Sequence, residues 1–167
     1  MDLSLNGKHA LVCGASEGIG RAAAHELALL GADVTLLARR ADVLETLVQA
    51  LPRTQGQEHG WLSADVLDTD RLRAQVQALA AGKPVHILVN NTGGPPGGPV
   101  SGADSAAFER AFRQHLLANQ ALVQAVLPGM NSSANPISRS AVPWRNGPKT
   151  SEAPAASPRS MESISFR

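Results

Sequence analysis

Two hydrophobic patterns alternate along the chain. Short, largely apolar runs at residues 10–13, 33–38, 61–62 and 85–89 are typical of buried strands, and the first of them is apolar throughout. Between them, apolar residues recur every three or four positions, which predicts amphipathic helices. We therefore expect an α/β fold in which strands alternate with helices, and hence a parallel sheet. Right-handed crossovers would place about four strands in the order 3-2-1-4, the first part of a doubly wound nucleotide-binding sheet.

The spacing also predicts an apolar face on each helix. The first helix, which Gly31 ends, has apolar residues at helical spacing: Ile19, Ala23, Leu27 and Leu30. The second, capped by Asp42 and ended by Pro52, presents Val43, Leu44, Leu47 and Leu51. The third, capped at Asp68 and ended by Gly82, presents Leu72, Val76 and Leu79. A long helix from Asp104 to Pro128 carries Phe108, Phe112, Leu116, Val123 and Val126.

The pattern stops near Met130. Residues 1–130 contain 20 leucines, whereas residues 131–167 contain none and carry 9 serines and 5 prolines. A segment this poor in large apolar residues cannot bury enough surface to offset the entropy of ordering. We expect a partial nucleotide-binding domain over 1–130 and a disordered Ser/Pro-rich tail over 131–167.

Charge and composition exclude several classes of partner. The net charge is +1, so nothing indicates a nucleic-acid partner. No apolar run reaches membrane-spanning length, because Asp33, Arg39 and Arg40 interrupt the best candidate. A single cysteine, Cys13, suits a reducing compartment. We expect a soluble cytoplasmic protein with no membrane partner.

A glycine-rich turn follows the first predicted strand. The sequence from Cys13 to Gly20 leads from an apolar run through three glycines, Gly14, Gly18 and Gly20, into a helix. Backbone N–H groups at a helix start and the helix dipole favour an anion there, so the turn is typical of a phosphate site. The spacing is not the common G-x-G-x-x-G, and an ordinary strand–helix turn is the alternative interpretation.

Three later positions fit a dinucleotide. Arg39 follows the second strand, where an acidic residue would bind the 2′-hydroxyl of NAD and an arginine suits a 2′-phosphate. Asp65 follows the third strand and could accept from an adenine amino group, with Val66 packing nearby. Asn91 and Gly93 lie in the turn after the fourth strand, where ligands collect in open α/β sheets. Each position has an alternative interpretation. Arg39 could be a solvated residue at the end of a strand, Asp65 could be a turn aspartate, and Asn91 with Gly93 could form a plain turn.

Together these motifs resemble the short-chain dehydrogenase/reductase family. The family motif T-G-x-x-x-G-x-G matches residues 13–20 with Cys13 in place of Thr, and N-N-A-G matches residues 90–93 with Thr92 in place of Ala. The family pattern L-P-x-M matches residues 127–130. The resemblance covers residues 5–130 and implies a Rossmann-type fold and an NAD(P)(H)-dependent oxidoreductase that transfers hydride between carbonyl and alcohol.

The resemblance also implies roles for individual residues. The pyrophosphate and its neighbouring groups would be held by Gly14, Ser16, Gly18, Ile19 and Gly20. Arg39 would select NADP rather than NAD, Asp65 and Val66 would hold the adenine, and Asn91 and Gly93 would lie beside the nicotinamide ribose. Relatives often pair through the long helix, which here would give a homo-oligomer through residues 104–127.

The chemistry of the family is not matched. It uses a Tyr-x-x-x-Lys pair with a serine, and often an asparagine in the long helix, but this sequence has no tyrosine. The helix position of the asparagine holds His115. We assign no catalytic residue and no metal ligand, and we interpret the chain as truncated after the long helix. Our hypothesis is that the reading frame or gene changes near Met130.

Two functions follow from these observations. One is an NADP(H)-dependent oxidoreductase by resemblance, inactive alone because the Ser and Tyr-x-x-x-Lys segment is missing. The other is a non-catalytic NADP-binding fragment or interaction module, which includes a frameshifted remnant. Binding of the dinucleotide without turnover would favour the second.

Overall fold

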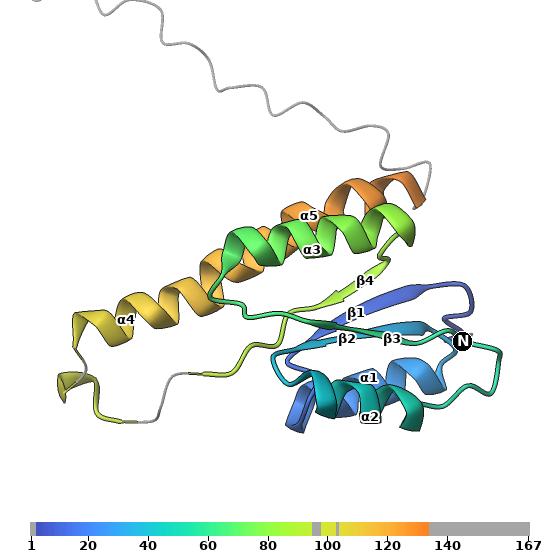
Figure 1. Cartoon of the computed structure of the whole chain (residues 1–167), viewed down its shortest axis with the longest axis horizontal. Coiled ribbons are helices and arrows are strands. Elements are labelled where there is room, and N and C mark those ends of the chain that lie inside the picture. The colour runs from blue at the N-terminus through green and yellow to red at the C-terminus, as the bar shows by residue number, and fades with distance from the viewer. Residues whose placement is uncertain (1–2, 95–97, 103, 134–167) are drawn as a thin grey trace, which may run out of the picture. The chain divides into compact units, whose positions relative to one another are not determined.

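Four parallel strands form a single sheet in the computed structural model, which describes residues 3–94, 98–102 and 104–133 (Figure 1). The strands are β1 (His9–Cys13), β2 (Asp33–Ala38), β3 (Gly60–Ser63) and β4 (Ile87–Val89). Their order is β3-β2-β1-β4, which confirms the predicted Rossmann-type order 3-2-1-4. The predicted disorder over 131–167 concerns residues that, from 134 onward, lie outside the described part of the chain.

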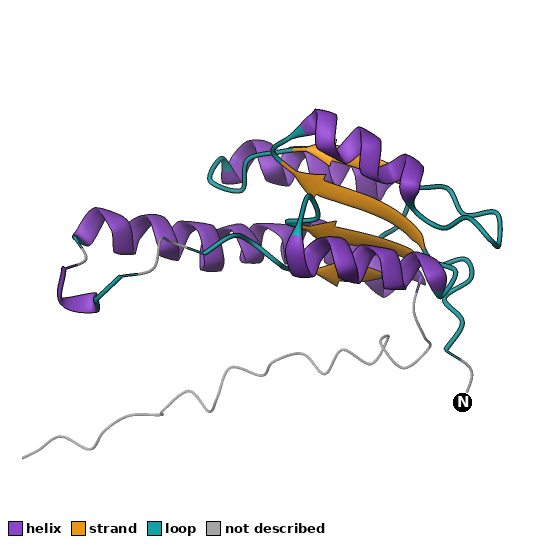
Figure 2. Cartoon of the chain, turned by 90° about the horizontal axis from the view of Figure 1, so that it is seen from below, coloured by secondary structure: helices purple, strands orange, loops and turns teal. Residues whose placement is uncertain are grey.

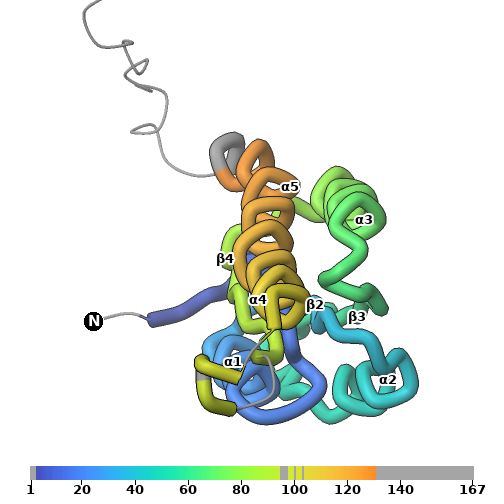
Figure 3. The backbone as a smooth tube through the Cα atoms, turned by 90° about the vertical axis from the view of Figure 1, so that its left-hand side faces the viewer, coloured from blue at the N-terminus to red at the C-terminus, as the bar shows by residue number. Residues whose placement is uncertain are grey.

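Helices cover both faces of the sheet. On one face lie α1 (Gly18–Leu29) and α2 (Ala41–Ala50), and on the other lie α3 (Thr69–Gly82) and α5 (Ala118–Ser133) (Figures 1 and 3). Within the described residues, none of these helices has both the length and the apolar character that crossing a membrane requires.

The central strand β1 is buried along its whole length. Its side chains alternate between two cores: Ala10 and Val12 pack with residues of α1 and α2, whereas Leu11 and Cys13 pack with residues of α3 and α5. Both faces of the sheet are therefore buried at β1, which explains the continuous apolar run in the sequence.

Helix α1 forms where the spacing predicts it, but its buried face is turned by one residue. The buried side is made by Gly20, Ala24 and Ala28, while Ile19 is 80% exposed and Leu30 is 37% exposed. Small residues on the buried face allow the helix backbone to approach the sheet closely, and spacing alone did not distinguish the two neighbouring faces.

One of the two predicted helix caps is found: the Asp68 side chain accepts a hydrogen bond from the backbone N–H of Arg71. Asp104, for which no cap was predicted, accepts from the backbone N–H of Ala107 in the same way. The predicted cap at Asp42 is wrong, because α2 begins at Ala41 with Arg40 in the cap position. Asp42 instead lies in the first turn, where its negative charge interacts favourably with the helix dipole.

The predicted long helix is divided into three segments. After the short 3₁₀ turn η1 (Val100–Gly102) come α4 (Ser105–Phe112), the π-helical η2 (Arg113–Leu117) and α5. The predicted end at Pro128 is wrong, because α5 continues to Ser133. Proline costs a helix one hydrogen bond, but Val126 and Met130 pack into the core on either side of it and offset that loss.

Most of the apolar residues at helical spacing on this long helix are exposed. Val126 is fully buried, but Phe108, Phe112, Leu116 and Val123 are between 41% and 57% exposed. Figure 2 shows α4 extending past the end of the sheet, where no strand lies beneath it. The apolar pattern predicted the helix correctly, and most of the residues that form the pattern lie outside the core.

Candidate functional site

The turns after β1 and β4 meet at the carboxyl edge of the sheet. A Cβ atom added at Gly14 would overlap the backbone carbonyl oxygen of Asn91, and Gly14 has a φ of +60°. A Cβ at Gly20 would overlap the Gly14 carbonyl and lie 2.7 Å from the Asn91 amide nitrogen. Only glycine fits at both positions, so the motif has a packing role in addition to any role in binding.

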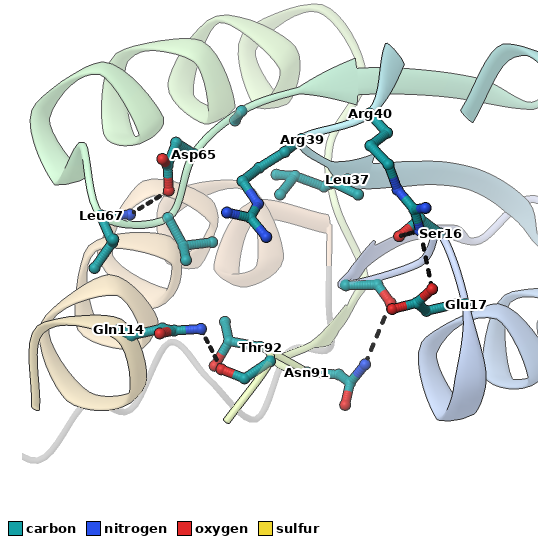
Figure 4. Close-up of a pocket in the computed structure, with 15 residues that line it drawn as sticks. Ser16, Glu17, Leu37, Arg39, Arg40, Asp65, Leu67, Asn91, Thr92 and Gln114 are labelled. Atoms are coloured by element: carbon teal, nitrogen blue, oxygen red, sulfur yellow. Dashed lines mark hydrogen bonds and ion pairs between the residues drawn. The ribbon is translucent and has the colours of Figure 1, made fainter. Parts of the chain in front are cut away.

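Asn91 joins the two turns directly. Its side-chain amide Nδ2 donates to the carbonyl oxygen of Gly14 over 3.4 Å (Figure 4). This contact connects the two glycine-containing turns that the family resemblance assigns to the pyrophosphate and the nicotinamide ribose.

An open cavity of about 680 Å³ lies above these turns, and its size suits a large ligand (Figure 4). Of the predicted site residues, seven line it: Gly14, Ser16, Arg39, Asp65, Val66, Asn91 and Gly93. The other three, Gly18, Ile19 and Gly20, belong to the first turn of α1 and do not line the cavity. The remaining lining residues are Glu17, Leu37, Ala38, Arg40, Ala64, Leu67, Thr92 and Gln114.

The two arginines after β2 differ in their contacts. Arg39 extends into the middle of the cavity in Figure 4, and its guanidinium has no hydrogen bond or ion pair with the residues that the structure describes. Arg40 instead turns toward the glycine turn, where its Nη2 lies 3.0 Å from the Glu17 carboxylate. A free guanidinium within a cavity can form charge-assisted bonds to an incoming anion.

Asp65 is a turn residue that also borders the cavity. Its carboxylate Oδ1 accepts a hydrogen bond of 3.0 Å from the backbone N–H of Leu67, as expected of a turn aspartate. It also lines the cavity together with Val66. The turn bond holds the carboxylate at the wall of the cavity.

The turn after β4 is also connected to the long helix. The Thr92 hydroxyl and His115 Nδ1 are 2.9 Å apart, and the Gln114 side chain donates to the Gly93 carbonyl. Both helix residues belong to the π-helical segment η2, a conformation that often marks functional sites. Sequence reasoning singled out His115 but not Gln114, whose position depends on the extra residue in that helical turn.

Cys13, which stands where the family motif has threonine, is chemically inert. It is fully buried, and this burial raises the pKa of its thiol to about 12. A thiol with so high a pKa is not a nucleophile at neutral pH.

The sequence model of the short chain dehydrogenase family matches residues 8–137. The chain belongs to this family. D-erythrulose reductase from Gallus gallus is 44% identical over 90 residues, which are 54% of this chain and 33% of that protein. L-xylulose reductase from Mesocricetus auratus is 34% identical over 136 residues, covering 81% of this chain and 52% of that protein.

Solved structures agree with the sequence comparison. L-sorbose reductase from Gluconobacter frateurii, in complex with NADPH and L-sorbose, superposes with a TM-score of 0.73 at 28% identity. The match covers 80% of this chain and 51% of the reductase. The chain therefore spans about half the length of these relatives or less.

Proposed function

We propose that the chain binds NADP(H) at the carboxyl edge of its sheet and does not catalyse hydride transfer by itself. The observation that carries this proposal is the free guanidinium of Arg39 in a cavity bounded by the glycine turn. The NADPH complex of the similar L-sorbose reductase supports the choice of dinucleotide.

Each part of the dinucleotide has residues suited to it. Backbone N–H groups of the turn and the start of α1, including Ser16, Gly18, Ile19 and Gly20, would face the pyrophosphate. Arg39 would bind the 2′-phosphate through charge-assisted bonds, and Asp65 with Val66 would hold the adenine. Asn91 and Gly93 would contact the nicotinamide ribose.

The bound cofactor supplies a hydride, and reduction of a carbonyl also requires a proton. In the family, tyrosine gives that proton, and this sequence contains none. The thiol of Cys13 is buried with a raised pKa and cannot replace it. The chain is thus a cofactor-binding part of an oxidoreductase, and its activity would depend on residues that it does not contain.

The test is a titration of the purified chain with NADPH, followed by an assay of carbonyl reduction. We expect saturable binding and no turnover with ketose substrates such as L-xylulose or L-sorbose. Turnover would contradict the proposed absence of catalytic residues. Absence of saturable binding would contradict the proposed function.

A second property, self-association, is proposed from the exposed apolar residues of the long helix. Phe108, Phe112, Leu116 and Val123 share one side of residues 104–127 with Leu127, and each is at least 41% exposed. An apolar stripe of this kind favours burial against another chain, and we propose a second copy as the occupant.

The single buried cysteine is in keeping with a cytoplasmic location, which we include in the proposal.

A further inference from the structure

Glu17 lies between the glycine turn and the second arginine of the cavity. Its carboxylate Oε2 lies 3.0 Å from Arg40 Nη2, and the same nitrogen donates to the Ser16 hydroxyl over 3.3 Å. Figure 4 shows the result: Arg40 turned down to the glycine turn, while Arg39 extends into the cavity. Two guanidinium groups thus border one cavity, and among the described residues only Arg40 has a partner for its guanidinium.

The carboxylate of Glu17 is not required to start the helix. Glu17 occupies the cap position of α1, yet its side chain makes no capping hydrogen bond. Its side chain is directed to Arg40 instead of to the N–H groups of the first turn. A purely structural role at the helix start is therefore not what holds this side chain in place.

The ion pair is open to exchange. The side chains of Arg40 and Glu17 are 54% and 80% exposed, and exposed ion pairs contribute little to stability. A phosphate dianion in the cavity would compete with Glu17 for Arg40, because a phosphate also accepts bidentate, charge-assisted bonds from a guanidinium. The Glu17 carboxylate would also repel that dianion, because Glu17 lines the same cavity and carries the same sign of charge.

This inference rests on the proposed function. We propose that Glu17 is a specificity-determining residue that acts through Arg40: it holds the Arg40 guanidinium away from the 2′-phosphate and so limits the preference for NADP(H) over NAD(H). Recognition of the 2′-phosphate then depends on Arg39 alone, and a single change at position 17 is sufficient to recruit the second arginine.

The experiment compares the dissociation constants of NADPH and NADH for the chain and for Glu17→Gln at low ionic strength. We expect NADPH to bind about threefold to tenfold more tightly to the variant, and NADH to bind within about twofold of the unchanged chain. High salt should reduce the gain, because it screens exposed charges. Glu17→Asp keeps the charge and should stay close to the unchanged chain.

Two further variants separate this mechanism from simpler ones. Glu26→Gln makes the same change in net charge on the exposed surface of α1, outside the cavity, and should leave both constants unchanged. Adding Arg40→Gln to Glu17→Gln should remove most of the gain in NADPH binding. Persistence of the full gain in that double variant would overturn the role of Arg40.

The outcomes distinguish this inference from the proposed function. Binding of NADPH by the unchanged chain with the same NADPH-to-NADH ratio in Glu17→Gln overturns the inference and leaves the proposed function intact. Absence of saturable binding of either dinucleotide by both chains overturns the proposed function and the inference with it.

Discussion

Arg39 is the residue on which the proposed choice of cofactor depends. We expect Arg39→Gln to weaken NADPH binding about tenfold to hundredfold, because a hydrogen bond to a charged group contributes roughly 1.5–3 kcal/mol. NADH binding should change little, since NADH lacks the 2′-phosphate. Fluorescence titration with both dinucleotides measures the difference.

Arg73→Gln is the matched control for this variant. Arg73 is exposed on α3, does not line the cavity, and has the same charge as Arg39. An equal loss of NADPH affinity in both variants would indicate a general effect of net charge and would contradict a specific role for Arg39.

Gly20 tests the packing between the two turns. We expect Gly20→Ala to lower the free energy of unfolding by about 1–3 kcal/mol, because its Cβ would overlap the Gly14 carbonyl and approach Asn91. Gly82→Ala is the matched control, since a Cβ there meets nothing within 4 Å and alanine favours a helix. Urea unfolding of both variants decides the matter, and equal stabilities would refute the packing role.

At the scale of elements, the amino edge of the sheet is held by three histidines. The buried His9 ring donates from Nδ1 toward the carbonyls of Lys83 and Pro84, and its Nε2 lies 2.8 Å from the Thr35 hydroxyl. Nδ1 of His86 accepts the backbone N–H of His9, and Nδ1 of His59 accepts that of Val34. These acceptor roles require neutral rings.

Desolvation lowers the pKa of each of these histidines below 6.5 in the fold. Below about pH 6.5 the unfolded chain therefore binds more protons than the folded chain does. The stability that is present above this pH is lost on acidification. We expect the free energy of unfolding to decrease from pH 7.5 to pH 5.5, as measured by urea unfolding.

Two variants distinguish the contribution of the histidines at the sheet from that of a histidine on a helix surface. His59→Gln should reduce the dependence on pH, whereas His25→Gln on the exposed surface of α1 should leave it intact. The same stability for the unchanged chain at both pH values would contradict the explanation.

A second charged contact supports the same edge. Lys83 Nζ lies 2.8 Å from an Asp33 carboxylate oxygen. Burial by itself would raise the pKa of Asp33, but the hydrogen bonds from Lys83 and from the Glu58 backbone outweigh it and lower this pKa. The contribution of the Asp33–Lys83 contact to stability is present at neutral pH and is lost only when the pH falls below the usual pKa range of aspartate. It therefore does not account for a change in stability between pH 7.5 and 5.5.

At the scale of the whole molecule, the exposed apolar side chains of α4 and α5 form the surface that we propose a second copy of the chain covers. We expect the chain to form dimers whose dissociation constant rises when Phe108 and Phe112 are both changed to Gln. Leu29→Gln on α1, where Leu29 is 45% exposed on the opposite layer, is the control. Sedimentation equilibrium measures the association, and a monomer at all concentrations would contradict the proposal.

Sequence reasoning succeeded where a local pattern fixes the structure. The strands, their order and the positions of the helices follow from hydrophobic periodicity and from the handedness of crossovers. It failed where neighbours decide: the exposure of Ile19, the cap of α2 and the continuation of α5 past Pro128 depend on what packs against each residue.

The sequence alone therefore determined the family, the sheet and seven of the residues that line the cavity, because glycines and apolar runs constrain the backbone locally. The tertiary structure decided which arginine is free. Arg39 and Arg40 are adjacent in sequence, and nothing in their spacing separates them. Only the fold brings Glu17 within 3.0 Å of Arg40, so the charge that could bind a phosphate is left on Arg39.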